Sequence, residues 1–460
     1  MTKKIAIIIL GIILWFIPHP PEISPEAWHL FTIFITTIFG VILGAFNILV
    51  ASVIGMVIAV LTGTIDPKTA FSGFSNDIVL LIVVAFLIAK AVVKSGLGKR
   101  IALLLISKFG STTLGLGYSL IASDMIISPA FPSNTARTGL LFPIIYSVSV
   151  VNGSDPEKGT RKKLGAFLMF ASMYGIGLSS AMWLTAMAAN PAGAAIAESY
   201  GVEIGFGSWV LAASLPTLAA AIIIPWILYK IFPPQIKDTP EAPLHAKKEL
   251  KKMGAMKKDE IITALVFTLL VVFWALSSVL DINKTIIAFL GFGLLLVTNV
   301  FKVKDIKNEG EALSTMIWFA ILFIMSSQLN TLGFMDYVGN IMAVQIEGIN
   351  KHIAFVLLVF VYIIFHYLFV SQTAHMMALL GVFLGAGKTL GIDPVQLALM
   401  LLFATNYFSV ITPQGSSCNI LYISSGYITP KEVYKFGGIL TFLSFIIYMI
   451  VGLPWISFVN

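Results

Sequence analysis

The sequence predicts an all-α, polytopic membrane protein that contains an internal repeat. Hydrophobic residues fill 58% of the 460 positions and charged residues only 11%, against about 25% charged in an average soluble domain. Apolar runs long enough for about 20 helical residues recur along the chain, whereas a transmembrane β-barrel would give weakly alternating segments of about 10 residues. Two of these runs, in opposite halves, are interrupted by the related segments "SNTAR" (133–137) and "SQTAH" (371–375).

The charge distribution and the missing motifs exclude several other classes of protein. The formal net charge is +7, but the Lys and Arg residues lie in loops between apolar runs, which is a topology signal and not a nucleic-acid-binding surface. The single cysteine, Cys418, excludes an intramolecular disulfide. The sequence holds no GxxxxGKS/T or His-Glu-x-x-His motif, no cysteine cluster and no long polar domain. We therefore expect no enzyme, no cofactor, no metal site and no nucleic-acid partner.

The chain begins with a candidate span that resembles a secretory signal. Lys3 and Lys4 precede an apolar stretch at 5–17, as in the charged and apolar regions of a signal peptide. No small-residue cleavage pattern follows, because residues 18–21 read "PHPP". We therefore expect a retained first helix.

The rest of the first half follows from the apolar runs and their breaks. Three spans and an amphipathic stretch precede a tract that is too long for one span and that "SPAFPSNTARTG" interrupts. A second tract is expected to break at Asn190-Pro191, and one more span closes this half. In order, these elements are expected at 28–45, 47–63, 77–95, 99–110, 112–151, 164–197 and 207–232.

The second half repeats this order after one long polar linker at 233–258. Its two long tracts are interrupted at "SQTAH" and at "TPQGSSC", and Pro-x-Gly recurs, at 191–193 and 413–415. These matches together indicate an internal duplication. The elements are expected at 259–280, 284–301, 314–334, 336–349, 352–386, 396–428 and 436–456.

The loops predict the topology. If each of the tracts 112–151 and 352–386 is a helical hairpin that enters and leaves on one side, the loops divide into two sets. Nearly all of the 29 Lys and Arg residues fall in the set that includes the N-terminus, which we therefore expect to be cytoplasmic. The hairpins then enter from opposite sides, and such an inverted repeat is a transporter architecture with its binding site near the midplane. The exceptions on the other side are Lys68, Lys284, Lys351 and Lys388.

The two hairpin tips carry the same order of side chains: hydroxyl, amide, hydroxyl, alanine. These groups can offer hydrogen-bond donors to an anion, and helices that begin after Thr135 and Thr373 would add positive partial charge suited to carboxylates. The alternative is that the hydroxyls only cap the hairpin turns. The residues concerned are Ser133, Asn134 and Thr135 at the first tip and Ser371, Gln372 and Thr373 at the second.

Each tip ends in a residue that can carry positive charge, Arg137 or His375. An arginine at bilayer depth costs a few kcal/mol, so a compensating interaction is expected. Asp124 and His366, each upstream of a tip, are candidate partners, and direct contact with a ligand is the alternative. For His375 alone, an interior histidine with satisfied hydrogen bonds is a further alternative.

The two other breaks, near Asn190 and Thr412, each contain a proline, Pro191 or Pro413, that removes a backbone hydrogen bond. They would expose carbonyl and N–H groups at mid-depth. An ordinary proline kink is the alternative.

These features resemble the divalent anion:sodium symporter (DASS) family, which carries di- and tricarboxylates. The family has two Ser-Asn-Thr motifs at the tips of opposed re-entrant hairpins, matched by 133–135 and, with one departure, by 371–373. Thr412-Pro413 and "SSGYI" at 424–428 are similar to its second unwound loop. The resemblance implies that the motif residues bind substrate, with Thr412 and Pro413 beside it. We also expect Asn190, at the other break, to bind substrate.

The resemblance also implies an elevator-type homodimer in the lipid bilayer, in which a transport domain slides past a scaffold. The amphipathic stretches 99–110 and 336–349 would be its membrane-parallel arms. The implied segments are a first scaffold half (1–110), a first transport half (111–232), a cytoplasmic linker (233–258), a second scaffold half (259–350) and a second transport half (351–460).

The chain departs from the sodium-coupled members of the family. These tend to have a second hydroxyl two positions after the motif threonine, where this chain has Arg137 and His375, and Gln372 replaces an asparagine that helps build a sodium site. "SNTAR" and "TAH" instead resemble the exchanger branch, which includes 2-oxoglutarate/malate translocators and citrate/succinate antiporters.

We therefore expect sodium-independent antiport of a compact dicarboxylate (succinate, malate, fumarate or 2-oxoglutarate) across a bacterial inner (plasma) membrane. Arg137 and His375 would compensate the substrate's charge, and the emptied site would keep unpaired positive charge that hinders its return. A sodium-coupled dicarboxylate symporter is the main alternative. An anion channel and an integral membrane enzyme are more distant alternatives.

Overall fold

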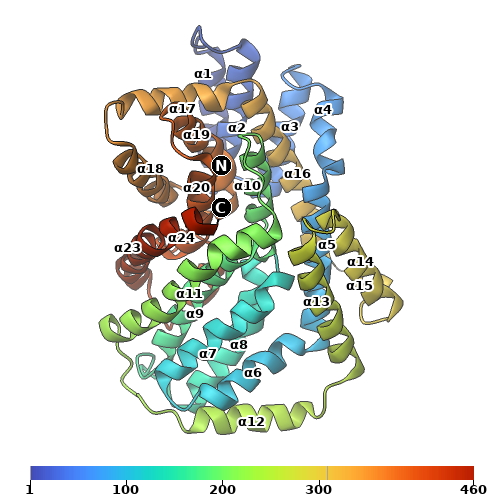
Figure 1. Ribbon diagram of the computed structural model, residues 1–460, viewed down its shortest axis with the longest axis vertical. Helices are drawn as coiled ribbons and strands as arrows, with labels where there is room; N and C mark the ends of the chain where they lie inside the picture. The colour runs from blue at the N-terminus through green and yellow to red at the C-terminus, as the bar shows by residue number, and fades with distance from the viewer. Residues whose placement is uncertain (1, 308, 460) are drawn as a thin grey trace. The chain divides into compact units, whose positions relative to one another are not determined.

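The computed structural model describes residues 2–307 and 309–459, and within them every regular element is helical (Figure 1). Eight helical stretches of this described chain are long and apolar enough to cross a membrane. The predicted all-α, polytopic fold is therefore confirmed. These stretches are Pro25–Ile42, Asp77–Ser95, Gly165–Met182, Phe206–Ile231, Lys258–Leu276, Gly310–Thr331, Lys351–Leu368 and Pro430–Val459.

The first half follows the predicted order of elements. The helix expected at the N-terminus forms, but its 15 residues are fewer than the roughly 20 that a membrane span needs. Its helices are α1 (Thr2–Phe16), α2 (Pro25–Ile42), α3 (Ile48–Leu61), α4 (Pro67–Ser72), α5 (Asp77–Ser95), α6 (Leu97–Phe109), α7 (Thr113–Ile127), α8 (Asn134–Val151), α9 (Gly165–Met182), α10 (Ala189–Glu198) and α11 (Phe206–Ile231).

The second half repeats this order from α13 onward. Its last span alternates α-helical and π-helical turns. The helices are α12 (Glu241–Met253), α13 (Lys258–Leu276), α14 (Lys284–Val297), α15 (Val303–Ile306), α16 (Gly310–Thr331), α17 (Phe334–Gln345), α18 (Lys351–Phe365), α19 (Gln372–Thr389), α20 (Pro394–Tyr407), α21 (Ser417–Ser424), α22 (Pro430–Glu432), π-helix η6 (Val433–Gly437), α23 (Gly438–Ile447), π-helix η7 (Tyr448–Gly452) and α24 (Leu453–Val459).

Short 3₁₀ turns mark the four predicted interruptions. The two hairpins are α7–η2–α8 and α18–η4–α19, with η2 at Ser128–Ala130 and η4 at His366–Leu368. The two broken helices are α9–η3–α10 and α20–η5–α21, with η3 at Leu184–Ala186 and η5 at Phe408–Val410. A further 3₁₀ turn, η1 (Gly73–Ser75), precedes α5.

The positions of three interruptions, the two hairpin tips and the first helix break, differ from the prediction. The hairpin helices begin before Thr135 and Thr373, at Asn134 and Gln372, because serines at 133 and 371 already cap them. The first broken helix opens between Met182 and Ala189, so Pro191 lies in the first turn of α10 and not in the break. A proline is tolerated there, because the N–H groups of the first turn have no intrahelical partner.

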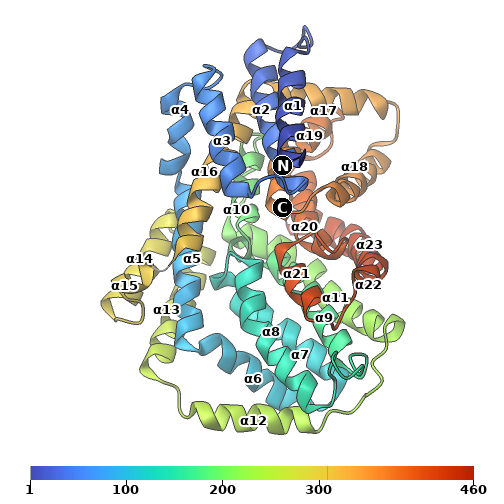
Figure 2. The same ribbon diagram turned by 180° about the vertical axis from the view of Figure 1, so that it is seen from behind.

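The linker at 233–258 contains a helix, α12, that the sequence analysis did not predict. Figures 1 and 2 show α12 running alongside α6. Arg100 on α6 forms a largely buried ion pair with Glu260, with an Nε to Oε1 distance of 2.6 Å, and donates to the carbonyl of Gly254 at 3.0 Å. These bonds fix the end of the linker against α6.

The chain divides into two compact units, each discontinuous in sequence. Of the described residues, one unit comprises 2–83, 191–204, 307 and 309–402, and the other comprises 84–190, 205–306 and 403–459. The first unit contains the second hairpin, with α17 packed on α19, and the second unit contains the first hairpin and both helix breaks. Three of the boundaries between the units fall inside the helices α5, α10 and α20.

Candidate functional site

The tip of the first hairpin is the N-terminus of α8. Ser133 has an extended backbone, and its Oγ accepts a hydrogen bond from the N–H of Ala136 at 3.2 Å. Ser133 is therefore a helix cap, as one interpretation of the sequence held. Asn134 and Thr135 occupy the first turn, where backbone N–H groups point outward and favour anions.

A second helix N-terminus lies beside this tip. Thr135 Oγ1 is 2.7 Å from the Oγ of Ser417, the first residue of α21. The ends of α8 and α21 therefore meet at an accessible pair of hydroxyls. Ser417 was not singled out in the sequence, where it is one of several small polar residues in "TPQGSSC".

Arg137 lies directly behind the tip and is fully buried. Its Nη1 donates to Asp124 Oδ2 at 2.6 Å and to Ser179 Oγ at 2.5 Å. Asp124 is 1% exposed, so this is an ion pair within the protein interior. Asp124 was one of the candidate partners of Arg137, and the structure confirms this pairing.

The other terminal nitrogen of Arg137 is surrounded by oxygen atoms. Nη2 donates to Asn134 Oδ1 at 2.7 Å, to the carbonyls of Ile176 and Ala186 at 3.3 Å each, and to Ser180 Oγ. Four oxygens from α8, α9 and η3 thus converge on one cationic group. We call this group of oxygens the oxygen cage.

The expectation of an unpaired positive charge at the tip is wrong in this conformation. Asp124 compensates the guanidinium, because a buried charge is tolerated only when it is paired and hydrogen-bonded. The arginine also orients the tip, because its Nη2 holds Asn134 Oδ1 while the Asn134 NH₂ group lies 3.9 Å from the sulfur of Met187. Arg137 is therefore a positioning residue for Asn134.

The two broken helices are held open by two asparagines with the same bonding pattern. Asn190 Nδ2 donates to the carbonyls of Ser180 at 2.9 Å and Trp183 at 3.2 Å, ten and seven residues upstream. Asn419 Nδ2 donates to those of Ser409 at 2.8 Å and Thr412 at 3.1 Å, at the same two offsets. Asn190 and Asn419 therefore occupy equivalent positions in the two breaks. The two Pro-x-Gly segments, which the sequence suggested as equivalent, do not.

Asn190 therefore supports the helix break. Besides the two bonds of its Nδ2, its Oδ1 accepts from Asn406 Nδ2 at 2.8 Å, and its side chain is fully buried. In this structure Asn190 supports the backbone of the break, and its contact with substrate stays a prediction. The breaks approach closely at Gly177, where a Cβ would lie 2.9 Å from the carbonyl oxygen of Asn406, so only glycine fits there.

Thr412 and Pro413 lie in the second break, as predicted. Thr412 is fully buried, and its Oγ1 has no hydrogen-bond partner among the described residues. A buried hydroxyl without a partner costs free energy, which a bound anion would offset. Pro413 is half-buried.

The second tip, in the other unit, shares the cap but not the surroundings of its basic residue. Ser371 Oγ accepts from the N–H of Ala374 at 3.3 Å, Gln372 is buried and Thr373 is half-buried. The ring of His375 is buried edge-on against Tyr362 and Phe369, with centroid separations of 4.4 and 4.9 Å, and 5.2 Å from His366. The similar segments "SNTAR" and "SQTAH" therefore place their basic residues in different environments: Arg137 in an ionic one and His375 in an aromatic one.

Comparison with known families gives the identity of this architecture. The family model described as "Sodium:sulfate symporter transmembrane region" matches residues 1–460. The chain belongs to the DASS family. This DASS protein is a multi-pass membrane transporter, as expected.

Several relatives align over nearly the whole chain. A "Putative malate transporter YflS" of Bacillus subtilis is 41% identical, with 97% of this chain and 94% of the relative covered. "Dicarboxylate transporter 2, chloroplastic" of Spinacia oleracea is 38% identical, with 97% and 80% covered. "Inner membrane protein YbhI" of Escherichia coli is 33% identical, with 99% and 97% covered.

The fold is found in solved structures, and the YdaH transporter is an example. The YdaH transporter of Alcanivorax borkumensis, described as having an unusual topology, superposes with a TM-score of 0.59 over 85% of this chain and 88% of YdaH. The sequence identity is 13%, so this likeness concerns the fold alone.

Proposed function

We propose that this protein exchanges dicarboxylates across the membrane by sodium-independent antiport with alternating access. The substrate class is supported by the names of the relatives, which include a malate transporter and several dicarboxylate transporters. Each tip offers serine and threonine hydroxyls, an amide and a helix N-terminus, which suit one carboxylate group. Succinate, malate, fumarate and 2-oxoglutarate are compact molecules that carry such carboxylate groups.

The oxygen cage is the observation that carries the proposed sodium independence. Carbonyl, amide and hydroxyl oxygens are the ligands that hard cations such as sodium require. In this chain the four oxygens of the cage are bonded to Arg137 Nη2. A guanidinium is a cation that stays attached to the protein and does not lose its proton. The cage therefore holds a cation that is part of the protein. In a sodium-coupled carrier, a sodium ion bound by such oxygens would be released after each transport step.

In this proposal, exchange follows from the positive partial charge of the helix N-termini at the tip, which no anion balances when the transporter returns without substrate. The charge of Arg137 is already compensated by Asp124, so the barrier to the empty transporter cannot come from an unpaired guanidinium. It comes instead from the N-terminal amides of α8 and α21, and from groups such as the Thr412 hydroxyl, which would cross the membrane without an anion. A new dicarboxylate satisfies them and lowers the barrier.

The proposal assigns substrate contacts to the two tips and the second break. The carrier would work as an elevator-type homodimer in a bacterial inner membrane, with its N-terminus in the cytoplasm. The Lys and Arg distribution and the inner-membrane relative YbhI support this location and orientation. The proposed contact residues are Ser133, Asn134, Thr135, Ser371, Gln372, Thr373, Thr412 and Pro413, to which we add Ser417.

A sodium-coupled symporter is the alternative, and the second tip favours it. There the basic residue is His375 in an aromatic environment, and no arginine stands at the corresponding position to hold a set of oxygens. A sodium site at that tip would make transport depend on the sodium gradient.

Uptake by proteoliposomes distinguishes the two functions. The purified protein is reconstituted with or without internal succinate, and uptake of labelled succinate is followed with sodium or with choline outside. We expect rapid uptake only into succinate-loaded vesicles and no difference between the two cations. Sodium-stimulated uptake into empty vesicles would refute exchange and establish the symporter.

A further inference from the structure

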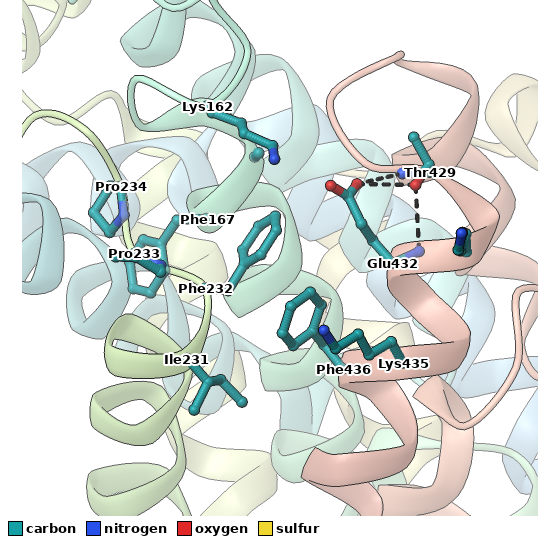
Figure 3. Close-up of a pocket in the computed structure, with 12 residues that line it drawn as sticks. Lys162, Phe167, Ile231, Phe232, Pro233, Pro234, Thr429, Glu432, Lys435 and Phe436 are labelled. Atoms are coloured by element: carbon teal, nitrogen blue, oxygen red, sulfur yellow. Dashed lines mark hydrogen bonds between the residues drawn. The ribbon is translucent and has the colours of Figure 1, made fainter.

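A hollow of about 490 Å³ lies where three membrane-crossing stretches of one compact unit begin or end. It is bordered by the start of α9, the end of α11 with the prolines that follow it, and the first turns of the last span. Figure 3 shows the hollow with basic and aromatic side chains around it. None of the residues that line it belongs to the tips or the helix breaks. The lining residues are Lys162, Ala166, Phe167, Ile231, Phe232, Pro233, Pro234, Thr429, Lys431, Glu432, Lys435 and Phe436.

Three exposed lysines, Lys162, Lys431 and Lys435, give the hollow a positive charge. The one carboxylate in its wall, Glu432, does not cancel them, because it is already bound elsewhere. Its two oxygens accept from the guanidinium of Arg161 at 2.8 and 2.9 Å, and Oε2 accepts from the N–H of Thr429 at 2.9 Å. The lysines therefore leave an excess of positive charge facing the hollow.

The floor of the hollow is aromatic and rigid. Phe232 and Phe436 lie 4.8 Å apart between ring centroids, and the Lys435 ammonium lies 5.2 Å from the ring centroid of Phe436. Figure 3 shows these two rings between Lys162 and Lys435. Phe436 and Lys435 belong to the π-helix η6, a distortion often found at functional sites. This turn packs closely against the chain at Val410. A Cβ at position 437 would lie only 1.8 Å from the carbonyl oxygen of Val410, so the turn requires Gly437.

Exposed apolar side chains lie on two of the spans that border the hollow. Ile231 at the end of α11 is 37% exposed, and Tyr434 and Ile439 on the last span are 46% and 39% exposed. A ligand that fits must therefore combine an anionic group with an apolar part that extends along membrane helices. Basic pockets at the ends of transmembrane helices suit the headgroups of anionic lipids.

We propose that this hollow binds the headgroup of an anionic phospholipid, with its phosphate among the three lysines. The aromatic floor would contact the glycerol and the first acyl carbons, and the acyl chains would follow Ile231 and Ile439 into the bilayer. The site is separate from the proposed transport function and needs neither a direction of transport nor a coupling ion.

Lipid retention by the purified full-length protein tests the proposal. The protein in detergent is titrated with phosphatidylglycerol or phosphatidylcholine, and bound lipid is counted by native mass spectrometry. We expect specific retention of phosphatidylglycerol. Each lysine near an anionic surface contributes about fivefold to binding, so the triple variant Lys162→Gln, Lys431→Gln, Lys435→Gln should lose on the order of 100-fold in affinity.

A matched control changes three exposed lysines of α12 in the same way: Lys247→Gln, Lys248→Gln, Lys251→Gln. This variant has the same net charge as the first and should retain phosphatidylglycerol like the unmutated protein. Equal losses in both triple variants, or equal retention of the two lipids, would overturn the proposal. Thermal unfolding with inorganic phosphate alone tests whether the hollow binds a free anion. The lipid assignment would also be overturned if phosphate stabilised the protein as much as phosphatidylglycerol does and if this stabilisation disappeared in the first variant.

Discussion

Replacing Arg137 by glutamine separates the two roles of the guanidinium, charge balance and occupation of the oxygen cage. The variant leaves Asp124, which is 1% exposed, without its partner. Breaking a buried ion pair by removing one member costs about 3–5 kcal/mol. The variant also loses most of the six hydrogen bonds of the guanidinium. The expected loss of about 3–5 kcal/mol is a large fraction of a typical folding free energy of about 5–15 kcal/mol.

The double variant Asp124→Asn, Arg137→Gln restores the charge balance but not the cage. No uncompensated charge remains buried, so we expect it to recover at least about 2 kcal/mol of the loss in the single variant. Both variants lack the fixed cation, so neither should catalyse normal succinate exchange. Stability should thus follow the charge of the pair, and transport should follow the presence of the guanidinium.

The assay combines thermal unfolding in detergent with counterflow in proteoliposomes for the single variants, the double variant and the unmutated protein. Arg100→Gln serves as the control, because it breaks the other largely buried arginine ion pair, with Glu260, and should reduce stability without changing sodium dependence. Additive losses of stability would show that Asp124 and Arg137 are not coupled. Undiminished sodium-independent exchange by the double variant would refute the role assigned to the cage.

Three further predictions concern the tip, the breaks and the topology. Thr135→Ala should raise the half-saturation concentration for succinate by roughly 10- to 150-fold, as expected for about 1.5–3 kcal/mol per hydrogen bond to a carboxylate, and an unchanged value would reduce the tip to a helix cap. Asn190→Ala and Asn419→Ala should each lower stability by about 1–3 kcal/mol, because two buried carbonyls lose their donor, and thermal unfolding in detergent measures this; a much smaller effect at one site would contradict their equivalence. Lys251→Cys in a Cys418→Ser background should resist an impermeant thiol reagent in intact right-side-out cells, and rapid labelling there would reverse the predicted topology.

Much of the architecture could be predicted because it depends on local properties of the chain. The length and apolarity of a run decide whether it can cross a bilayer, and a break in a run must be filled by polar groups or proline. These properties placed the two hairpins and indicated that each of the two later tracts is broken. Their limit appears at Pro191, which marks a break in the sequence but lies in the first turn of α10. A proline restricts the backbone equally in a kink and at a helix start, so the residue type alone does not separate them.

The sequence alone determined that this is a helical membrane protein with a duplicated plan, and it identified Ser133, Asn134, Thr135 and Arg137 as residues of one tip. Only the tertiary structure decided what these residues do. It joined Thr135 to Ser417 across 282 positions, paired Arg137 with Asp124 and surrounded it with oxygens from α9 and η3. It also gave His375 aromatic neighbours, although its motif matches that of Arg137. The physical reason is that composition and periodicity report burial and helix length, whereas the partner of a buried polar group depends on which distant helices pack against it.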